Sequence, residues 1–305
     1  MPDIHDDLLL GFYELFRGRN DARGTEQGGC ERGEFAQARF ADHLNGIEGL
    51  GVYPMAPFGD AHGGTEWAVR WGCVDLDVRA DHKRRWDYES TDDAWIAALN
   101  LHAVLAAFGI TAWIEHTKSG GFHVWVFTTE WVPATDMRRC LLVACSVADV
   151  PPTEVNPKNE QFDTSATLGN YVRLPYFGAI GPISARPILD PHDRNPYGVF
   201  EFVDEAMHNR TRPDTIRGVA DLWQPPAPAP TPIRKHTAAP AVMSRRLQSI
   251  ISNGPLKQED RSGWLYYVAR ICADDGLPPN EAEQIVAYCD EQHTRKFVNR
   301  NEGPA

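Results

Sequence analysis

The sequence predicts an α+β protein in which one sheet carries the functional residues. Three patterns support this prediction. Apolar and polar residues alternate over residues 71–79, which is the period of a half-buried strand. Apolar residues then recur at helical spacing over residues 91–108. A glycine-rich turn at residues 117–121 separates two further strand-like runs. Strands and helices that follow one another in this way pack as helices on a sheet.

Short elements precede this sheet and predict an N-terminal α/β unit. Residues 8–16 have the spacing of an amphipathic helix, and a glycine-rich, charged loop extends from there to residue 32. A second helix is predicted at residues 34–44, and residues 51–54 predict a short strand or turn that Pro54 closes. Arg17 and Arg19 follow the first helix, where arginines either grip phosphate or simply face solvent.

From Val69 onward the predicted elements follow the order β-α-β-β-α-β. The helix after the first strand has Thr91 as its N-cap and Gly109 just past its end. The remaining elements are strands at 110–115 and 122–127, a helix at 134–147 and a strand at 153–156. This order is that of the ferredoxin-like and RNA-recognition (RRM) folds. In that topology the first and third strands lie side by side at the centre of the sheet, and the fourth strand flanks the first.

The rest of the chain predicts one more strand and a separate helical domain. Residues 169–175 read as a strand, whereas residues 180–205 look irregular. The proline-rich run at 225–232 is typical of a semi-rigid linker. Helices are predicted beyond it at 244–251, at 260–274 and after an N-cap at Asn280. We therefore divide the chain into a catalytic domain (1–223), a linker (224–240) and a small all-α domain (241–305).

Composition and charge exclude several classes of protein. A net charge of −12 argues against a generally cationic surface for nucleic acid, although a local basic groove is compatible with it. The six cysteines form no C-x-x-C pair, so neither a zinc cluster nor a disulfide framework is indicated. The N-terminus lacks the features of a signal peptide, and no apolar run approaches a membrane span. We expect a cytoplasmic protein with reduced thiols and no membrane partner.

Asp75 and Asp77 are candidate metal ligands on the first strand. Same-face side chains on a strand lie roughly 6.5 to 7 Å apart, so both carboxylates can converge on a pair of divalent cations. The predicted topology places His123 and Glu154 on the two strands beside them. The alternative is an edge strand with a solvated acidic face, which does not account for these neighbours. Three hard oxygen donors suit Mg²⁺ or Mn²⁺ rather than zinc.

The turn before the third strand is a candidate phosphate site. A glycine-rich backbone with Lys118 and Ser119 beside Gly120 can cradle a triphosphate. His123, two residues past the turn, can donate a hydrogen bond to a phosphate oxygen. Taken singly, an ordinary hairpin turn and a structural histidine explain these residues equally well. Combined with two metal ions, they suit an in-line phosphoryl displacement on a nucleoside triphosphate.

Four segments occur together in a specific order and spacing. They are V-D-L-D-V (74–78), K-S-G-G-F-H-V-W-V-F (118–127), T-E-V-N-P-K (153–158) and G-N-Y-V-R-L-P-Y-F (169–177). Together they resemble the archaeo-eukaryotic primase superfamily, specifically the primase-polymerases of phages and mobile elements. The motifs L-F-R-G-R-N-D (15–21), H-L-N-G (43–46) and G-V-Y-P (51–54) also resemble that group. The segment 241–305 resembles the small C-terminal domains that follow such primase cores.

The resemblance implies roles for individual residues. Asp75, Asp77 and Glu154 would hold two Mg²⁺ or Mn²⁺ ions, and Lys118, Ser119, Gly120 and His123 would contact the incoming triphosphate. Asn170 and Arg173 match as further nucleotide-binding residues. The chain departs from the family in two respects. It lacks the N-terminal zinc cysteines of some relatives, and the usual S-G-x-G-x-H spacing is shortened to S-G-G-F-H.

The expected function is template-directed nucleotidyl transfer on single-stranded DNA, by a DNA primase and polymerase that takes NTPs or dNTPs. The resemblance implies a place in phage or mobile-element replication and a helicase domain or partner. One alternative is a metal-dependent nuclease or phosphodiesterase, which the triphosphate-like turn disfavours. The other is a non-catalytic nucleic-acid-binding module built on the same sheet. Two carboxylates on that sheet face would repel each other without cations, which disfavours the module.

Overall fold

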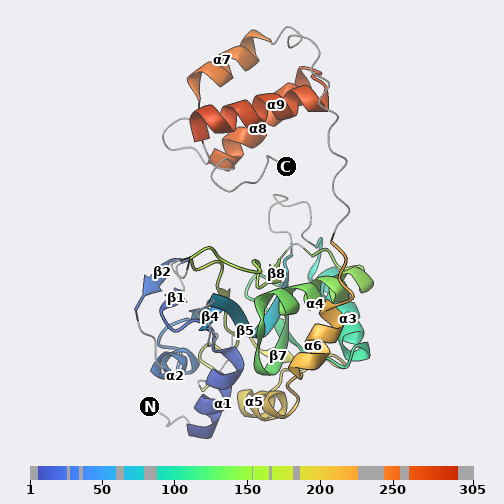
Figure 1. Cartoon of the computed structure of the whole chain (residues 1–305). Coiled ribbons are helices and arrows are strands. Elements are labelled where there is room, and N and C mark those ends of the chain that lie inside the picture. Colours follow the sequence, from blue (N-terminus) through green and yellow to red (C-terminus); the bar gives the residue numbers. More distant parts are fainter. Residues whose placement is uncertain are drawn as a thin grey trace. The chain divides into compact units, whose positions relative to one another are not determined.

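The computed structural model describes residues 6–25, 28–33, 37–59, 65–78, 88–152, 154–164, 167–180, 186–225, 244–254 and 261–294. Contacts within the chain divide it into two compact units, Met1–Pro225 and Pro226–Ala305 (Figure 1). Most of the predicted linker lies outside the described residues, as does the end of the chain after residue 294. Within the described residues, no helix is long and apolar enough to cross a membrane.

The larger sheet of the first unit has the predicted β-α-β-β-α-β order at its centre. Across the sheet the strands are β10 (Ile188–Leu189), β6 (Ala112–His116), β7 (Phe122–Pro133), β5 (Thr65–Leu76) and β4 (Ala56–Gly59), and β8 (Val155–Asn156) also pairs with β5. Helix α3 (Thr91–Ala107) joins β5 to β6, and α4 (Ala134–Val147) joins β7 to β8. As predicted, β5 and β7 are neighbours, and β8 lies on the other flank of β5. The α+β fold class is confirmed.

Both faces of the larger sheet are buried around β5 and β7. Val74 and Leu76 belong to a first core formed with α3, α4 and α6 (Pro213–Ala220). Trp71 and Cys73 belong to a second core formed with α1 (Asp6–Phe16), α2 (Ala38–Leu44) and α5 (Val199–His208). The prediction of a half-buried β5 was therefore wrong over most of the strand, because the N-terminal elements cover its second face. The end of the strand at Asp75 reaches the edge of this cover, and the Asp75 side chain is half-buried.

A smaller sheet joins the N-terminal elements to the rest of the unit. Its strands are, in order, β2 (Cys30–Arg32), β1 (Ala22–Gly24), β3 (Gly51–Val52) and β9 (Val172–Arg173). The hairpin of β1 and β2 replaces the loop that was predicted there. Strand β9 follows the larger sheet's β8 in the sequence but pairs with β3 of the smaller sheet. It therefore brings residues 170–173 alongside the N-terminal elements.

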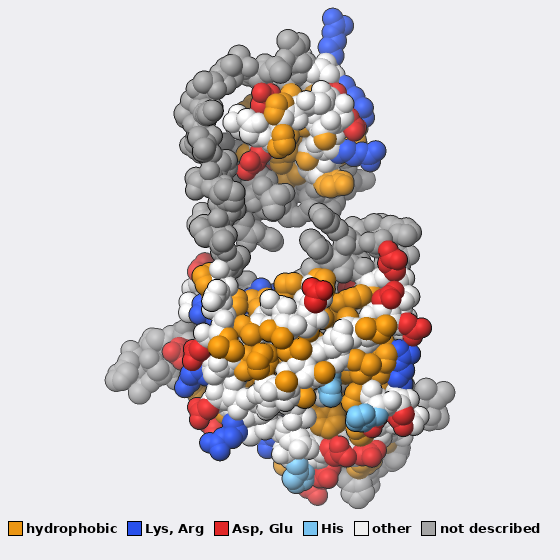
Figure 2. Space-filling view, turned by 90° about the vertical axis from the view of Figure 1, so that its right-hand side faces the viewer, with side chains coloured by type: hydrophobic (Ala, Val, Ile, Leu, Met, Phe, Trp, Pro, Cys, Tyr) orange, Lys and Arg blue, Asp and Glu red, His pale blue; other side chains and the backbone are white. Residues whose placement is uncertain are grey.

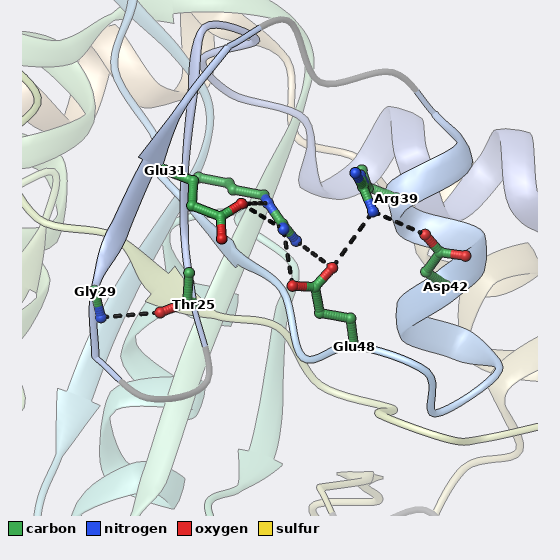
Figure 3. Close-up of polar contacts among 7 residues, drawn as sticks. Thr25, Gly29, Glu31, Arg39, Asp42 and Glu48 are labelled. Atoms are coloured by element: carbon green, nitrogen blue, oxygen red, sulfur yellow. Dashed lines mark hydrogen bonds and ion pairs between the residues drawn. The ribbon is translucent and has the colours of Figure 1, made fainter.

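Ion pairs fasten the β1–β2 hairpin to α2. The buried Arg23 guanidinium contacts Glu31 Oε2 at 2.6 Å and Glu48 Oε2 at 2.7 Å. Arg39 extends the network from Glu48 to Asp42 (Figure 3). The hydrogen bond that Arg23 donates to Glu48 raises the pKa of Arg23 most strongly, and Glu31 raises it further. This charge-assisted network, in which only Arg23 is buried, links the hairpin to the helix.

The two arginines after α1 are structural rather than exposed. Arg19 donates to both Asp21 carboxylate oxygens at 2.6 Å and to the Thr167 carbonyl oxygen at 2.6 Å. Its side chain is 1% exposed. Arg17 pairs with Glu14 at 2.7 Å. The phosphate-binding alternative is thus not supported for Arg19, which links the N-terminal loop to the segment before β9.

Local signals placed several element ends wrongly and missed one helix. Ser90, and not Thr91, is the N-cap of α3, because its hydroxyl accepts from the Asp93 amide at 3.1 Å. Strand β7 continues six residues beyond the predicted end, to Pro133. Helix α5 lies in a region predicted to be irregular, and its buried residues recur at helical spacing at Val199, Phe202, Val203 and Ala206.

The side of the first unit that carries α3, α4 and α6 has hydrophobic side chains gathered on it (Figure 2). Ile96 on α3 and Val147 on α4 are 56% and 61% exposed. These helices cover the face of the larger sheet turned away from Asp75 and His123. The apolar area is therefore separate from the polar end of β5.

The second unit is helical and has its own core. It contains α7 (Arg245–Asn253), α8 (Arg261–Asp274), α9 (Pro279–Cys289) and a π-helical turn, η1 (Asp290–Thr294). Ser244 caps α7 by accepting from the Leu247 amide at 3.1 Å. Helix α9 begins at Pro279 after Pro278, so the predicted Asn280 cap is wrong. Proline suits the first helical position because it lacks the amide that would go unpaired there.

Candidate active site

A cleft of about 680 Å³ lies between the two sheets of the first unit. Side chains from both sheets line it, including every predicted site residue except Gly120: Asp75, Asp77, Lys118, Ser119, His123, Glu154, Asn170 and Arg173. Its volume is within the range of small-molecule sites, which is about 300 to 1,000 Å³. Residues that are almost 100 positions apart in the sequence thus meet in one cavity of suitable size.

The end of β5 presents two carboxylates to this cleft. Asp75 and Asp77 are half-buried, whereas Leu76 between them is buried in the first core. Asp75 pairs across the sheet with His123 on β7, and its amide donates to the Glu154 carbonyl oxygen at 2.9 Å. Asp77 lies one residue past the end of β5, and its carbonyl oxygen accepts from the Tyr88 amide at 2.9 Å. The predicted neighbours of Asp75 are therefore its actual neighbours.

Glu115, His123 and Asp75 form a row across three neighbouring strands. His123 Nδ1 lies 2.8 Å from Glu115 Oε2, and His123 Nε2 lies 3.5 Å from Asp75 Oδ1. Trp125 Nε1 donates to the same Glu115 oxygen at 2.7 Å. Glu115 is fully buried, so its hydrogen bonds hold the imidazole with Nδ1 turned inward and Nε2 turned toward the cleft.

The charges in this row favour the protonated imidazole. Burial alone lowers the pKa of His123, because it disfavours the imidazolium. The carboxylates of Glu115 and Asp75 outweigh burial and raise the pKa to about 10. His123 is thus a cation that can donate from both ring nitrogens.

Sequence reasoning did not single out Glu115. A usable signal existed, because Glu115 is the one charged residue in the run Ala112–His116 that forms β6. The turn at 117–121 pairs it directly with His123. A carboxylate in an apolar strand, opposite a predicted site histidine, is the pattern that would have found it.

The turn between β6 and β7 is tight and lies against the end of β5. The Thr117 amide donates to the Gly121 carbonyl oxygen at 2.9 Å, and Gly120 has a φ of +86°. That φ is readily adopted only by glycine. A Cβ at Gly121 would collide with the carbonyl oxygen of Leu76. The shortened S-G-G-F-H spacing thus still gives a compact turn, whose second glycine allows close approach to Asp77.

Glu154 and its neighbours form the β8 side of the cleft. The Glu154 carboxylate pairs with Lys158, four residues later. Arg138 on α4 donates to the carbonyl oxygens of Val155 and Pro157 at 3.0 and 2.9 Å. Burial lowers the pKa of Arg138. These bonds anchor the segment that carries Glu154.

The cleft offers hard oxygen donors for a divalent cation. In the part of the chain that the structure describes, no three His, Cys, Asp or Glu side chains are close enough together to form a preassembled metal cluster. Asp75, Asp77 and Glu154 nevertheless line the same cleft, and carboxylates are the donors that Mg²⁺ and Mn²⁺ prefer. Their chemistry therefore fits these ions, with Lys158 as the present partner of Glu154.

The smaller sheet supplies the opposite wall. Asn170 and Arg173 both line the cleft, as predicted. The predicted strand at 169–175 is only two residues long, so Arg173 lies on β9 and Asn170 lies in the loop before it. Sequence reasoning missed Tyr53, Tyr171 and the buried Arg186, which also line it. Tyr171 lies within the G-N-Y-V-R motif, so its position next to Asn170 was the available signal.

The fold and the cleft together define an archaeo-eukaryotic primase core. A family model described as the archaeo-eukaryotic primase domain of TOTE conflict systems matches residues 25–180, just over half of the chain. The chain belongs to this family. No curated protein matches the sequence.

Among solved structures, the chain is similar to the polymerase domain of ligase D from Mycobacterium tuberculosis, which was solved in complex with DNA. The two are 15% identical, and the match covers 64% of this chain and 69% of that one, with a TM-score of 0.28. At this identity and TM-score, the family model carries the assignment.

Proposed function

We propose that the chain is a template-directed primase-polymerase that joins nucleotides on single-stranded DNA. The observation that carries the proposal is one cleft that holds three carboxylates together with the 117–121 turn and His123. Membership of the archaeo-eukaryotic primase family supports nucleotidyl transfer as the type of reaction.

Asp75, Asp77 and Glu154 are the residues that would hold two Mg²⁺ or Mn²⁺ ions. Such ions, when bound, activate an attacking oxygen and stabilise a leaving one in an in-line displacement. The other residues of the cleft act on the nucleotide. The backbone around Gly120, with Lys118 and Ser119, binds the triphosphate.

His123 donates to a phosphate oxygen from Nε2, the nitrogen that Glu115 leaves turned toward the cleft. His123 lies between the carboxylates of Glu115 and Asp75, which favour its protonated form, and a charged donor at this position complements a phosphate. Asn170 and Arg173 bind the same nucleotide from the smaller sheet. The proposed partners are a single-stranded DNA template and NTPs or dNTPs. The phage or mobile-element setting and a helicase partner rest on the sequence resemblance and stay predictions.

A hydrolase would use the same carboxylates with water as the nucleophile. Lengthening and shortening of DNA separate the two functions in one assay. The full chain is incubated with a 5′-labelled primer annealed to a longer template, Mn²⁺ or Mg²⁺, and all four nucleotides. We expect products longer than the primer. Products that are only shorter than the primer would instead support a nuclease.

A further inference from the structure

On the side of the cleft formed by the smaller sheet, two glycines on neighbouring strands lie beneath an aromatic ring. Gly24 on β1 and Gly51 on β3 are cross-strand partners. A Cβ at either position would collide with the ring of Tyr171. The ring therefore lies directly on the backbone of both strands. Neither glycine has a positive φ, so backbone conformation does not explain their presence. Their presence is explained by the space that the Tyr171 ring occupies.

Other contacts hold this ring in place. The Tyr171 hydroxyl donates to the Thr25 carbonyl oxygen at 3.4 Å. The Tyr53 ring, which is buried, stands edge-on to it with centroids 5.5 Å apart and an interplanar angle of 74°. Edge-to-face packing is a favoured arrangement for two aromatic rings. Tyr171 is thus a fixed aromatic surface, only half-buried, with both rings lining the cleft.

The cleft has two walls of different chemistry. The larger sheet supplies Asp75, Asp77 and His123, which suit metal ions and phosphates. The smaller sheet supplies the two tyrosine rings, beside Asn170 and Arg173. A ligand that satisfies both walls has an anionic end and a flat aromatic end. A nucleoside triphosphate has both, whereas inorganic triphosphate has only the first.

We propose that Tyr171, seated on Gly24 and Gly51, is the surface on which the base of the incoming nucleotide lies. This inference rests on the proposed function and extends it to a nucleobase subsite. Stacking of a base on an aromatic ring is tolerant of base identity, because every base has a π-face. The subsite therefore contributes affinity for all four nucleotides, and the template supplies the selection among them.

The test compares nucleotide with inorganic tripolyphosphate. Affinities of the full chain for dATP, for tripolyphosphate and for a single-stranded oligonucleotide are measured calorimetrically in Mg²⁺. Tyr171→Leu fills the space over the glycines without an aromatic face, and we expect it to weaken dATP binding about ten- to a hundredfold. Tripolyphosphate and oligonucleotide binding should stay at the wild-type level. Tyr171→Phe should bind dATP nearly normally.

Two further variants complete the test, one beneath the ring and one remote from it as a control. Gly24→Ala adds a methyl group beneath the ring, and we expect it to weaken dATP selectively although it does not itself face the ligand. Tyr266→Leu alters a 73% exposed tyrosine of the second unit and should leave the affinities for dATP and tripolyphosphate unchanged.

Three results would overturn the inference while leaving the proposed function intact. They are unchanged dATP affinity in Tyr171→Leu, an equal loss for dATP and tripolyphosphate, and a loss confined to the oligonucleotide, which would place a template base on the ring. A wild-type chain that binds neither dATP nor tripolyphosphate would instead overturn the proposed function, and the subsite with it.

Discussion

At the residue scale, the site depends on the buried carboxylate of Glu115. It does not line the cleft itself but orients His123, which does. Glu115 accepts from His123 and Trp125 on the same oxygen, and its second oxygen has no hydrogen-bond partner. The sequence predicted Asp75, His123 and Glu154 as neighbours because the pairing of β5 with β7 and β8 follows from topology. It did not predict Glu115, because the apolar residues of the strand dominate its pattern.

Replacing Glu115 should destabilise the protein. Glu115→Ala leaves two buried N–H donors without their acceptor, and each such loss costs about 1 to 3 kcal/mol. We expect a fall of about 3 kcal/mol in the free energy of unfolding, measured with urea. Glu115→Gln keeps an acceptor oxygen and should lose less. Glu201→Ala, on the exposed face of α5, is the control. An unfolding curve for Glu115→Ala that matches the control would mean that the hydrogen bonds to Glu115 do not stabilise the fold.

His43 should make stability depend on pH. It accepts from the Leu50 amide at 3.0 Å, and its Nε2 lies 2.8 Å from the Pro175 carbonyl oxygen. Burial lowers its pKa to about 4, against the raising effect of the hydrogen bond to Pro175 and with a further lowering by Arg186. The unfolded chain takes up this proton near pH 6.5 and the folded chain does not. Stability is therefore complete above pH 6.5 and falls as the pH drops toward 4, by about 3 kcal/mol in total.

The measurement is the urea unfolding free energy between pH 7.5 and 4. His43→Gln should flatten the decrease between pH 6.5 and 4, whereas His208→Gln, at an exposed position, should retain it. The same decrease in His43→Gln as in the wild type would assign the effect to other groups.

At the element scale, regular segments were predictable and short ones were not. The periodicity of β5, α3, β6, β7 and α4 was strong enough to give both their order and their pairing. The β1–β2 hairpin and β9 have two or three residues per strand, too few for a period to show. The joining of β9 to β3 is a contact over more than 100 residues, which local patterns do not encode. The wall formed by the smaller sheet was therefore predicted only at Asn170 and Arg173, and its tyrosines were missed.

The turn at 117–121 should tolerate no side chain at Gly121. A Cβ there meets backbone atoms of Leu76 and Asp77, which cannot rotate away as a side chain can. Gly121→Ala should separate the turn from the end of β5 and weaken tripolyphosphate binding at least tenfold. Gly218→Ala on α6 is a matched control, because no described atom lies within 4 Å of a Cβ there. It should bind normally and be slightly more stable, since alanine favours a helix by about 1 kcal/mol over glycine. Equal binding by the two variants would show that the turn does not touch phosphate.

At the scale of the whole molecule, the two units have separate cores and separate expected tasks. Extension begins from a primer that is already paired with its template, and that duplex places the 3′ oxygen. Initiation lacks the duplex, so another surface has to hold the first nucleotide and the bare template, a large orientation problem. Arg245 and Arg246 at the start of α7 are exposed and suit phosphate contacts. A spacer role toward a helicase is the competing interpretation of this unit.

A chain that ends at Pro225 should therefore extend primed templates at nearly the full rate but start few primers. Both rates are measured on the same template with the full and the shortened chain. Equal primer synthesis by the two chains would favour the spacer interpretation.

The central claim is that the chain joins nucleotides in an order set by a template, and that this reaction requires the carboxylates of the cleft. The most direct measurement is incubation of the full chain with unprimed homopolymer templates, Mn²⁺ or Mg²⁺, and one labelled nucleotide at a time. We predict products longer than a dinucleotide only when the nucleotide is complementary to the template, and none with Asp77→Ala, which should keep wild-type stability. Incorporation that ignores the template, or that persists at the wild-type rate in Asp77→Ala, would contradict the account.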